Sequence, residues 1–189
     1  LKATVYRDGK IYEQDYERGK AMYPVKPVGD SDKNGTTVTF RPDATIFIHT
    51  LEYNYDTLAS RLRELSYLNK GLTISLTDKR LKNDDGEFET ETFYSEIGLP
   101  EFIKYLDATR EPLMKDVIAF EGEKNGVPVE VAMIYNTSYA ENLHSYVNNI
   151  NTHEGGTHLS GFRRGLTHTL KKFADNSGML DKLKFDIAG

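Results

Sequence analysis

The sequence predicts an α+β protein in which antiparallel hairpins are followed by amphipathic helices. Two turn signals mark hairpins, Asp8-Gly9 and Asn125-Gly126, and each lies between runs in which apolar and polar residues alternate. Helical spacing is clearest after Gly156, where apolar residues recur every three or four positions as far as Phe173. The pattern therefore shows two successive blocks, each made of strands and a helix.

The first block opens with a hairpin from Leu1 to Arg18, turning at Asp8-Gly9. The segment from Ala21 to Asn34 contains prolines, glycines and mixed charges, so we expect a loop there. Thr36 to Arg41 alternates as a strand, and the proline that follows it ends the strand.

A helix and a second hairpin complete the first block. Asp56 is suited to cap the helix, Gly71 to stop it, and three leucines at helical spacing give it an apolar face. These leucines are Leu58, Leu62 and Leu65. Residues 72–76 then alternate as a strand, Lys82 to Gly86 is a polar turn, and Phe88 to Tyr94 is the returning strand.

The second block begins near Glu96-Ile97-Gly98. Pro100 opens a short helix, since a first turn does not need its N–H. Val117 to Tyr135 is the clearest hairpin in the chain, and Leu143 to Ile150 reads as one further strand. Met179 to Phe185 is expected to begin another strand.

The helix after Gly156 has an apolar stripe and a basic face. Thr157 is placed where an N-cap belongs. Between Gly155 and Ala174 there is no acidic residue, although there are four lysines or arginines. The apolar stripe comprises Leu159, Phe162, Leu166, Leu170 and Phe173, and the opposite half carries Arg163, Arg164, His168 and Lys171. Three interpretations are open: a solvated face, a surface for nucleic-acid phosphates, or a phosphate at the helix N-terminus.

The composition limits these interpretations. The chain has 189 residues, a formal net charge of -5 and a pI of about 5.6. A protein that only coats nucleic acid is usually basic, so any DNA contact here must be local. The absence of cysteine excludes disulfides and thiolate metal sites, and no apolar run approaches the roughly 20 residues of a membrane span.

Three runs of sequence resemble the DNA gyrase B family. They are YNTSYAENLHSYVNNINTHEGGTHLSGFRRGLTHTL from Tyr135 to Leu170, LRELSYLNKGLTISLTDKR from Leu62 to Arg80, and KNGTTVTFRPDATIF from Lys33 to Phe47. The resemblance covers nearly the whole chain in the same order, although the B protein of topoisomerase IV shares the EGGTH core. It implies the C-terminal part of a GHKL-type antiparallel sheet/helix layer at residues 1–98, followed by the N-terminal part of a βαβ-rich transducer domain at residues 99–189.

The resemblance also implies a function, that of a fragment of a cytoplasmic ATP-dependent type II DNA topoisomerase. Such a protein uses ATP and Mg2+, binds DNA and the gyrase A protein, and forms a homodimer through its ATPase gate. The family's general-base glutamate, magnesium asparagine, adenine-binding aspartate and glycine-rich lid all precede Leu1, and its Gln-Thr-Lys loop has no counterpart here. We therefore expect the chain to be a piece of a longer polypeptide and, alone, to lack ATPase activity. A standalone nucleic-acid-binding α+β module is the alternative.

The resemblance assigns a few site residues. Thr36 matches the threonine that binds the adenine side of the nucleotide, and Arg7 matches the arginine at the mouth of the pocket. Arg163 matches an arginine that lines the DNA-holding cavity, and by position Arg164 and Lys171 are expected to share that role. No catalytic residue is expected in the chain.

A metal site is not expected either. His153, Glu154 and His158 suggest one, but the spacing is not that of zinc ligands on a helix and glycines lie between them.

Overall fold

The computed structural model describes residues 1–138, 140–178 and 187. The chain divides into two compact units, Leu1–Asn54 and Tyr55–Gly189. Strands and helices occur together, and every strand pair in the described residues is antiparallel. This confirms the predicted α+β class, whereas the parallel pairs of a βαβ unit do not occur among the residues described. The strand expected at Met179 to Phe185 lies outside them.

The first unit is one antiparallel sheet of five strands. They are β1 (Lys2–Arg7), β2 (Lys10–Glu17), β3 (Lys20–Ala21), β4 (Lys26–Asp30) and β5 (Gly35–Thr39). The order along the main path is β3-β2-β1-β5, and β4 pairs with β2. The first hairpin turns as predicted, with positive φ at Asp8 (52°) and Gly9 (76°), the geometry that suits right-twisted strands.

The loop expected from Ala21 to Asn34 is wrong in part, because β4 occupies its middle. Pro27 of β4 lies opposite Tyr12 of β2, and the register shifts between Ile11 and Tyr12. Proline is tolerated on an outer strand, where its missing N–H faces no partner. The proline and glycine that indicate a loop in the sequence are thus part of an edge strand.

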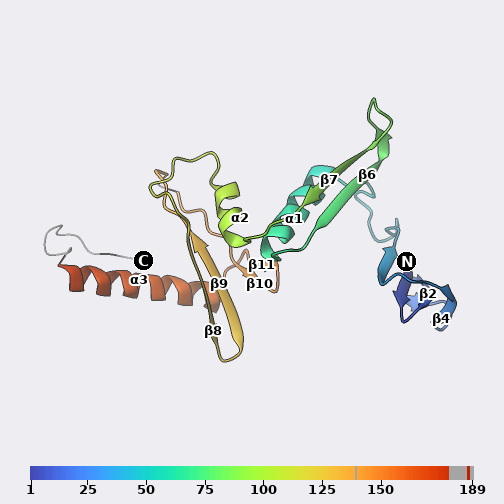
Figure 1. Cartoon of the computed structure of the whole chain (residues 1–189), viewed down its shortest axis with the longest axis horizontal. Coiled ribbons are helices and arrows are strands. Elements are labelled where there is room, and N and C mark those ends of the chain that lie inside the picture. The colour runs from blue at the N-terminus through green and yellow to red at the C-terminus, as the bar shows by residue number, and fades with distance from the viewer. Residues whose placement is uncertain (139, 179–186, 188–189) are drawn as a thin grey trace. The chain divides into compact units, whose positions relative to one another are not determined.

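The second unit contains three helices and three antiparallel hairpins in its described residues (Figure 1). The helices are α1 (Tyr55–Leu68), α2 (Leu99–Leu106) and α3 (Thr157–Ser177). The hairpins are β6 (Ile74–Lys82) with β7 (Phe88–Phe93), β8 (Ile118–Lys124) with β9 (Val127–Met133), and β10 (Tyr146–Val147) with β11 (Ile150–Asn151). None of the helices in the described part of the chain is long and apolar enough to cross a membrane.

Two predicted helix caps in this unit are wrong. Asp56 is the second residue of α1 and lies inside the helix instead of preceding it. Thr157 is the first residue of α3, and Gly156 holds the N-cap position without a side-chain cap. A Cβ on Gly156 would lie 2.8 Å from the His158 ring, so this position requires glycine.

The strand expected from Leu143 to Ile150 is also wrong. Asn148 and Asn149 have positive φ of 50° and 65°, and they turn the chain between the two short strands β10 and β11. Asn149 then anchors this hairpin to α1, since its backbone oxygen accepts a hydrogen bond from Arg61 at 2.7 Å and its side chain donates to Asn69 at 2.9 Å.

Aromatic rings form the core of the second unit. Phe102 of α2 is buried and stacks on Tyr67 of α1 at 5.2 Å between ring centroids. Tyr105 and Tyr146 lie beside this pair, at 5.8 Å from Tyr67 and 6.4 Å from Phe102 respectively. Burial, and then a hydrogen bond with Glu64, raises the pKa of the Tyr146 hydroxyl, which therefore stays neutral. Packing of these rings fixes α2 against α1.

A buried serine joins the ends of three elements. Ser95 follows β7 and is 1% exposed, and its hydroxyl accepts a hydrogen bond from the Gly98 N–H at 2.9 Å and donates one to Glu101 in the first turn of α2. Its backbone oxygen accepts the N–H of Gly71, after α1, at 2.8 Å. One residue thus holds β7, α2 and the segment after α1 together.

Replacing this hydroxyl is predicted to destabilise the fold. Ser95→Ala leaves the buried Gly98 N–H without its acceptor, which costs roughly 1–3 kcal/mol. Urea denaturation of the variant measures the loss. Ser75→Ala is the matched control, since Ser75 on β6 is exposed and bonds another exposed hydroxyl, that of Thr92. Equal effects of the two substitutions would contradict the role given to Ser95.

Candidate functional site

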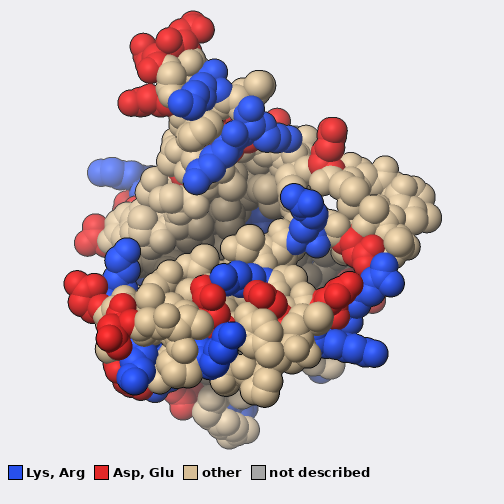
Figure 2. All heavy atoms as spheres, turned by 90° about the vertical axis from the view of Figure 1, so that its right-hand side faces the viewer, with Lys and Arg blue, Asp and Glu red and all other residues tan. Residues whose placement is uncertain are grey.

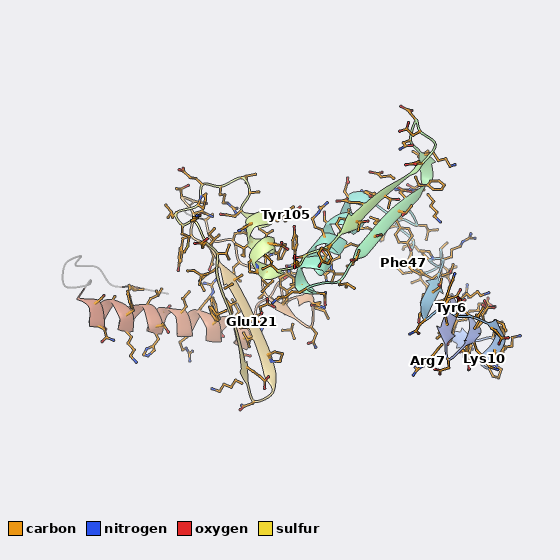
Figure 3. The ribbon with its side chains drawn as sticks, viewed as in Figure 1. Tyr6, Arg7, Lys10, Phe47, Tyr105 and Glu121 are labelled. Carbon is orange, nitrogen blue, oxygen red and sulfur yellow. The ribbon has the colours of Figure 1, made fainter. Side chains whose placement is uncertain are left out.

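The first unit carries a hollow where β1 meets β5. Its volume is about 730 Å3, and it is lined by residues 5–9 and 31–36. Both residues predicted to belong to a nucleotide pocket, Thr36 and Arg7, are among the lining residues. The sheet register explains why: Thr36 on β5 lies opposite Val5 on β1, two residues before Arg7. Figure 3 labels Tyr6 and Arg7 at the end of β1 and Lys10 across the turn.

The wall of this hollow is tied to its turn by the backbone. The N–H of Ser31 donates to the Gly9 oxygen at 3.0 Å, and the Ser31 hydroxyl accepts the Lys33 N–H at 3.0 Å. These bonds hold residues 31–36 beside the Asp8-Gly9 turn. The hollow is therefore built by a turn and a loop whose backbone positions are fixed.

The charges at the hollow are mixed. Arg7 is exposed, and its Nε lies 3.5 Å from an Asp8 carboxylate oxygen, so a solvated ion pair of small energy holds the guanidinium. Lys33 and Asp32 add one charge of each sign. The arrangement offers a hydroxyl from Thr36 and a guanidinium to a polar, anionic ligand. Among the described residues that line the hollow there is no glutamate to act as a general base.

The basic face lies on α3 in the second unit. Arg163 and Arg164 are exposed, whereas Lys171 is half-buried and has an interaction partner. The face is therefore less uniform than the sequence suggests. The apolar stripe on the same helix is only partly covered, since Phe173 is 64% exposed and the buried position is Ala174.

Arg163 is held by an acid that the sequence pattern does not reveal. Its Nη2 donates to the Glu141 carboxylate at 2.6 Å, and both side chains are exposed. Glu141 comes from the segment before β10, 22 residues upstream, so no local pattern announces it. That segment is anchored at Asn136, whose side-chain nitrogen donates to Asp107 at 2.6 Å. An exposed pair of this kind is worth about 0–1 kcal/mol, so a phosphate can displace the carboxylate.

The histidines near the start of α3 take part in a structural network. Nε2 of His158 lies 3.1 Å from the Thr152 hydroxyl, which lies 2.6 Å from the Ser145 hydroxyl. A second hollow of about 200 Å3 is lined in part by His144 and His153. Within the described part of the chain, no group of three or more His, Cys, Asp or Glu side chains is arranged to hold a metal ion.

The charged surface of the β6–β7 hairpin is distinct from both sites. Figure 2 shows acidic side chains gathered at the projecting tip of this hairpin, with basic side chains just below them. The tip contains Asp84 and Asp85, and the strand before it contains Lys79 and Lys82. This alternation is typical of a solvated hairpin.

Comparison with known proteins places these features in a family. The family model described as DNA gyrase B matches residues 98–189. A DNA gyrase B subunit from Cytophaga hutchinsonii is 57% identical over 189 residues, which are 100% of this chain and 39% of that protein. The chain thus spans about two fifths of the length of the relatives of this kind.

Solved structures agree. The 43K ATPase domain of Thermus thermophilus gyrase B, in complex with an aminocoumarin, is 30% identical with a TM-score of 0.77, over 94% of this chain and 47% of that one. The B-subunit of the DNA gyrase from Myxococcus xanthus is 26% identical with a TM-score of 0.75, over 92% of this chain and 50% of that one. By sequence and by fold, the chain belongs to the DNA gyrase B family.

Proposed function

We propose that this chain is part of the B subunit of an ATP-dependent type II DNA topoisomerase, a gyrase, that couples ATP binding and hydrolysis to DNA strand passage and supercoiling. The observation that carries the proposal is the hollow on the first unit. Thr36 and Arg7, identified from sequence as nucleotide-pocket residues, line it together in a chain similar to a gyrase B ATPase domain.

Only one side of a nucleotide fits the residues present. The Thr36 hydroxyl suits the polar edge of a base, and the Arg7 guanidinium suits an anionic or polar group at the mouth. Phosphoryl transfer further needs a base, metal ligands and a phosphate clamp, and residues of the longer protein supply these together with Mg2+. The residues of this chain therefore bind and orient, and they carry out no chemical step.

The proposal includes the two-domain organisation. Residues 1–98 form the later part of the ATPase domain, and residues 99–189 form the first part of the transducer domain. The start of the family match at residue 98 supports this division. So does the strained backbone of Gly98, whose φ is 84° at the junction before α2.

In the proposed function, α3 contacts passing DNA. Arg163 and Arg164 are exposed on one helix that has no acidic residue before Asp175, and Lys171 adds a third positive charge. Contacts from these side chains go to phosphates and carry no base readout. The Glu141 carboxylate holds Arg163 until a phosphate replaces it. The full protein works in the cytoplasm as a dimer together with the gyrase A protein.

The chain alone is predicted to show no ATP turnover. A base, a metal ligand and a phosphate clamp are all required in one site, and the described residues that line the hollow include no glutamate, the general base of this family. Phosphate release is measured on the purified chain. Turnover that follows the protein through successive columns and is lost in the Arg7→Gln variant would contradict the prediction.

Within the longer protein, Arg7→Gln is predicted to weaken binding of an aminocoumarin. Loss of a charged hydrogen bond costs about 1.5–3 kcal/mol, which corresponds to roughly tenfold to a hundredfold in Kd. Titration calorimetry measures the change. Arg41→Gln is the matched control, since Arg41 is an exposed arginine of the same unit that does not line the hollow. Unchanged affinity for Arg7→Gln would remove Arg7 from the site.

Arg163→Gln in the longer protein is predicted to reduce DNA-stimulated ATP hydrolysis and supercoiling. Loss of one phosphate contact lowers the salt dependence of DNA binding by about 0.9 in the slope of log K against log salt. Glu141→Gln is predicted to do the opposite and tighten DNA binding at low salt, because it frees Arg163. Lys104→Gln on the exposed face of α2 controls for net charge.

The salt slope decides between the outcomes. If Arg163→Gln behaves like Lys104→Gln, α3 is a solvated helix and the DNA assignment is wrong. If the isolated chain binds duplex DNA at about micromolar concentration in physiological salt, it acts as a standalone binding module, contrary to the proposal.

A further inference from the structure

A lysine beyond the end of α1 reaches two carboxylates on a different hairpin. The Lys70 ammonium pairs with Glu121 of β8 and lies 2.9 Å from a carboxylate oxygen of Glu130 on β9. Figure 3 labels Glu121 on this hairpin. All three side chains are partly exposed, between 34% and 67%. One cation thus bridges two strands from a helix that precedes them by about 50 residues.

The two carboxylates face each other across the hairpin. Glu121 and Glu130 are direct partners in the β8–β9 register, midway between the Ile118–Met133 pair at its base and the Lys124–Val127 pair at its tip. Like charges directly opposite one another destabilise an antiparallel pair. A cation placed between them replaces this repulsion with two attractions. The hairpin therefore contains a site that gains stability when a positive charge docks there.

The turn before α2 directs Lys70 toward this site. A Cβ added to Gly98 would lie 2.7 Å from Cγ of Lys70, so the lysine stem passes directly over the glycine. Gly98 is held in that position by the hydrogen bond from its N–H to the buried Ser95 hydroxyl. Hydrogen bonds to Glu121 and Glu130 raise the pKa of the Lys70 ammonium, so it stays charged.

We propose that Lys70, Glu121 and Glu130 form a charge clamp that holds the β8–β9 hairpin against the end of α1 and that opens to let the hairpin move. The base of the hairpin is fixed separately, because α2 packs against both of its strands. The clamp acts halfway along the hairpin and sets the direction in which it points. Its groups are solvated, so closure is reversible and sensitive to salt.

The clamp also spans the junction at Gly98. Lys70 precedes that glycine, and both glutamates follow it, so the clamp ties together the segments on its two sides. An open clamp leaves the turn at residues 95–98 and the aromatic packing of α2 to hold them. The charge clamp is therefore a conformational device that operates independently of the proposed pocket and DNA face.

Hydrogen exchange of the β8–β9 backbone amides in the 189-residue chain tests the clamp. Lys70→Met leaves two carboxylates facing each other without a cation, and exchange in the hairpin is expected to be about threefold to tenfold faster. Lys124→Met is the matched control, since it removes a positive charge from the same hairpin outside the clamp. Lys70→Arg restores the charge and is expected to return exchange toward the original rate.

A second variant separates the clamp from a simple loss of stability. Glu121→Gln with Glu130→Gln removes the repulsion together with the attraction, so its exchange is expected to be slower than that of Lys70→Met. In this double background, Lys70→Met is expected to add no further change. Raising the salt to about 0.5 M in the unmodified chain is expected to mimic Lys70→Met in part, because exposed charges are screened.

Spin labels report the motion directly, since the chain has no cysteine of its own. Labels on Ser60→Cys in α1 and Val127→Cys in β9 are expected to give one narrow distance distribution in the original chain and a broader one with Lys70→Met. The proposal is overturned if Lys70→Met matches Lys124→Met in both measurements. It is also overturned if Lys70→Met has its full effect when both glutamates have been replaced.

Discussion

The hydrogen bond from the Gly98 N–H to the buried Ser95 hydroxyl is the constraint on which the second unit depends. It closes the turn between β7 and α2, and the same serine binds Glu101 in α2 and, through its backbone oxygen, Gly71 after α1. Aromatic stacking between α1 and α2 follows from that geometry. So does the path of Lys70 over Gly98 toward the β8–β9 hairpin. A single buried polar group thus fixes two helices and a hairpin, and burial makes its loss costly.

Much of the fold could be predicted from local sequence, because its elements carry local signals. Asp8-Gly9 and Asn125-Gly126 adopt the positive φ values that the hairpin turns need, and Pro100 opens α2 as expected. The failures have physical reasons. β4 contains Pro27 and is a strand only because β2 provides a partner on one side, and the Asn148–Asn149 turn depends on its anchor to α1. Both are tertiary effects that hydrophobic periodicity does not register.

The candidate site shows the same division. Thr36 and Arg7 are identified by resemblance, and the sheet register brings them to one hollow. Glu141 and the clamp partners of Lys70 could not be found in the sequence, because ion pairs across 22 and about 50 residues leave no local pattern. Exposed charged residues look alike in sequence whether they are solvated or paired. For this reason the sequence identifies the basic helix but does not reveal the carboxylate that holds its first arginine.

A nucleotide hollow on one unit and a positive helix on another occur in a chain that spans about two fifths of its relatives. Their joint role is tested most directly by a structure of the longer protein with a non-hydrolysable ATP analogue and a short DNA duplex. We expect the Thr36 hydroxyl within hydrogen-bond distance of the bound nucleotide or its ordered water, and the Arg163 guanidinium moved from Glu141 to a DNA phosphate. A duplex held elsewhere while Arg163 still binds Glu141, with the analogue remote from the hollow at β1 and β5, would contradict that role.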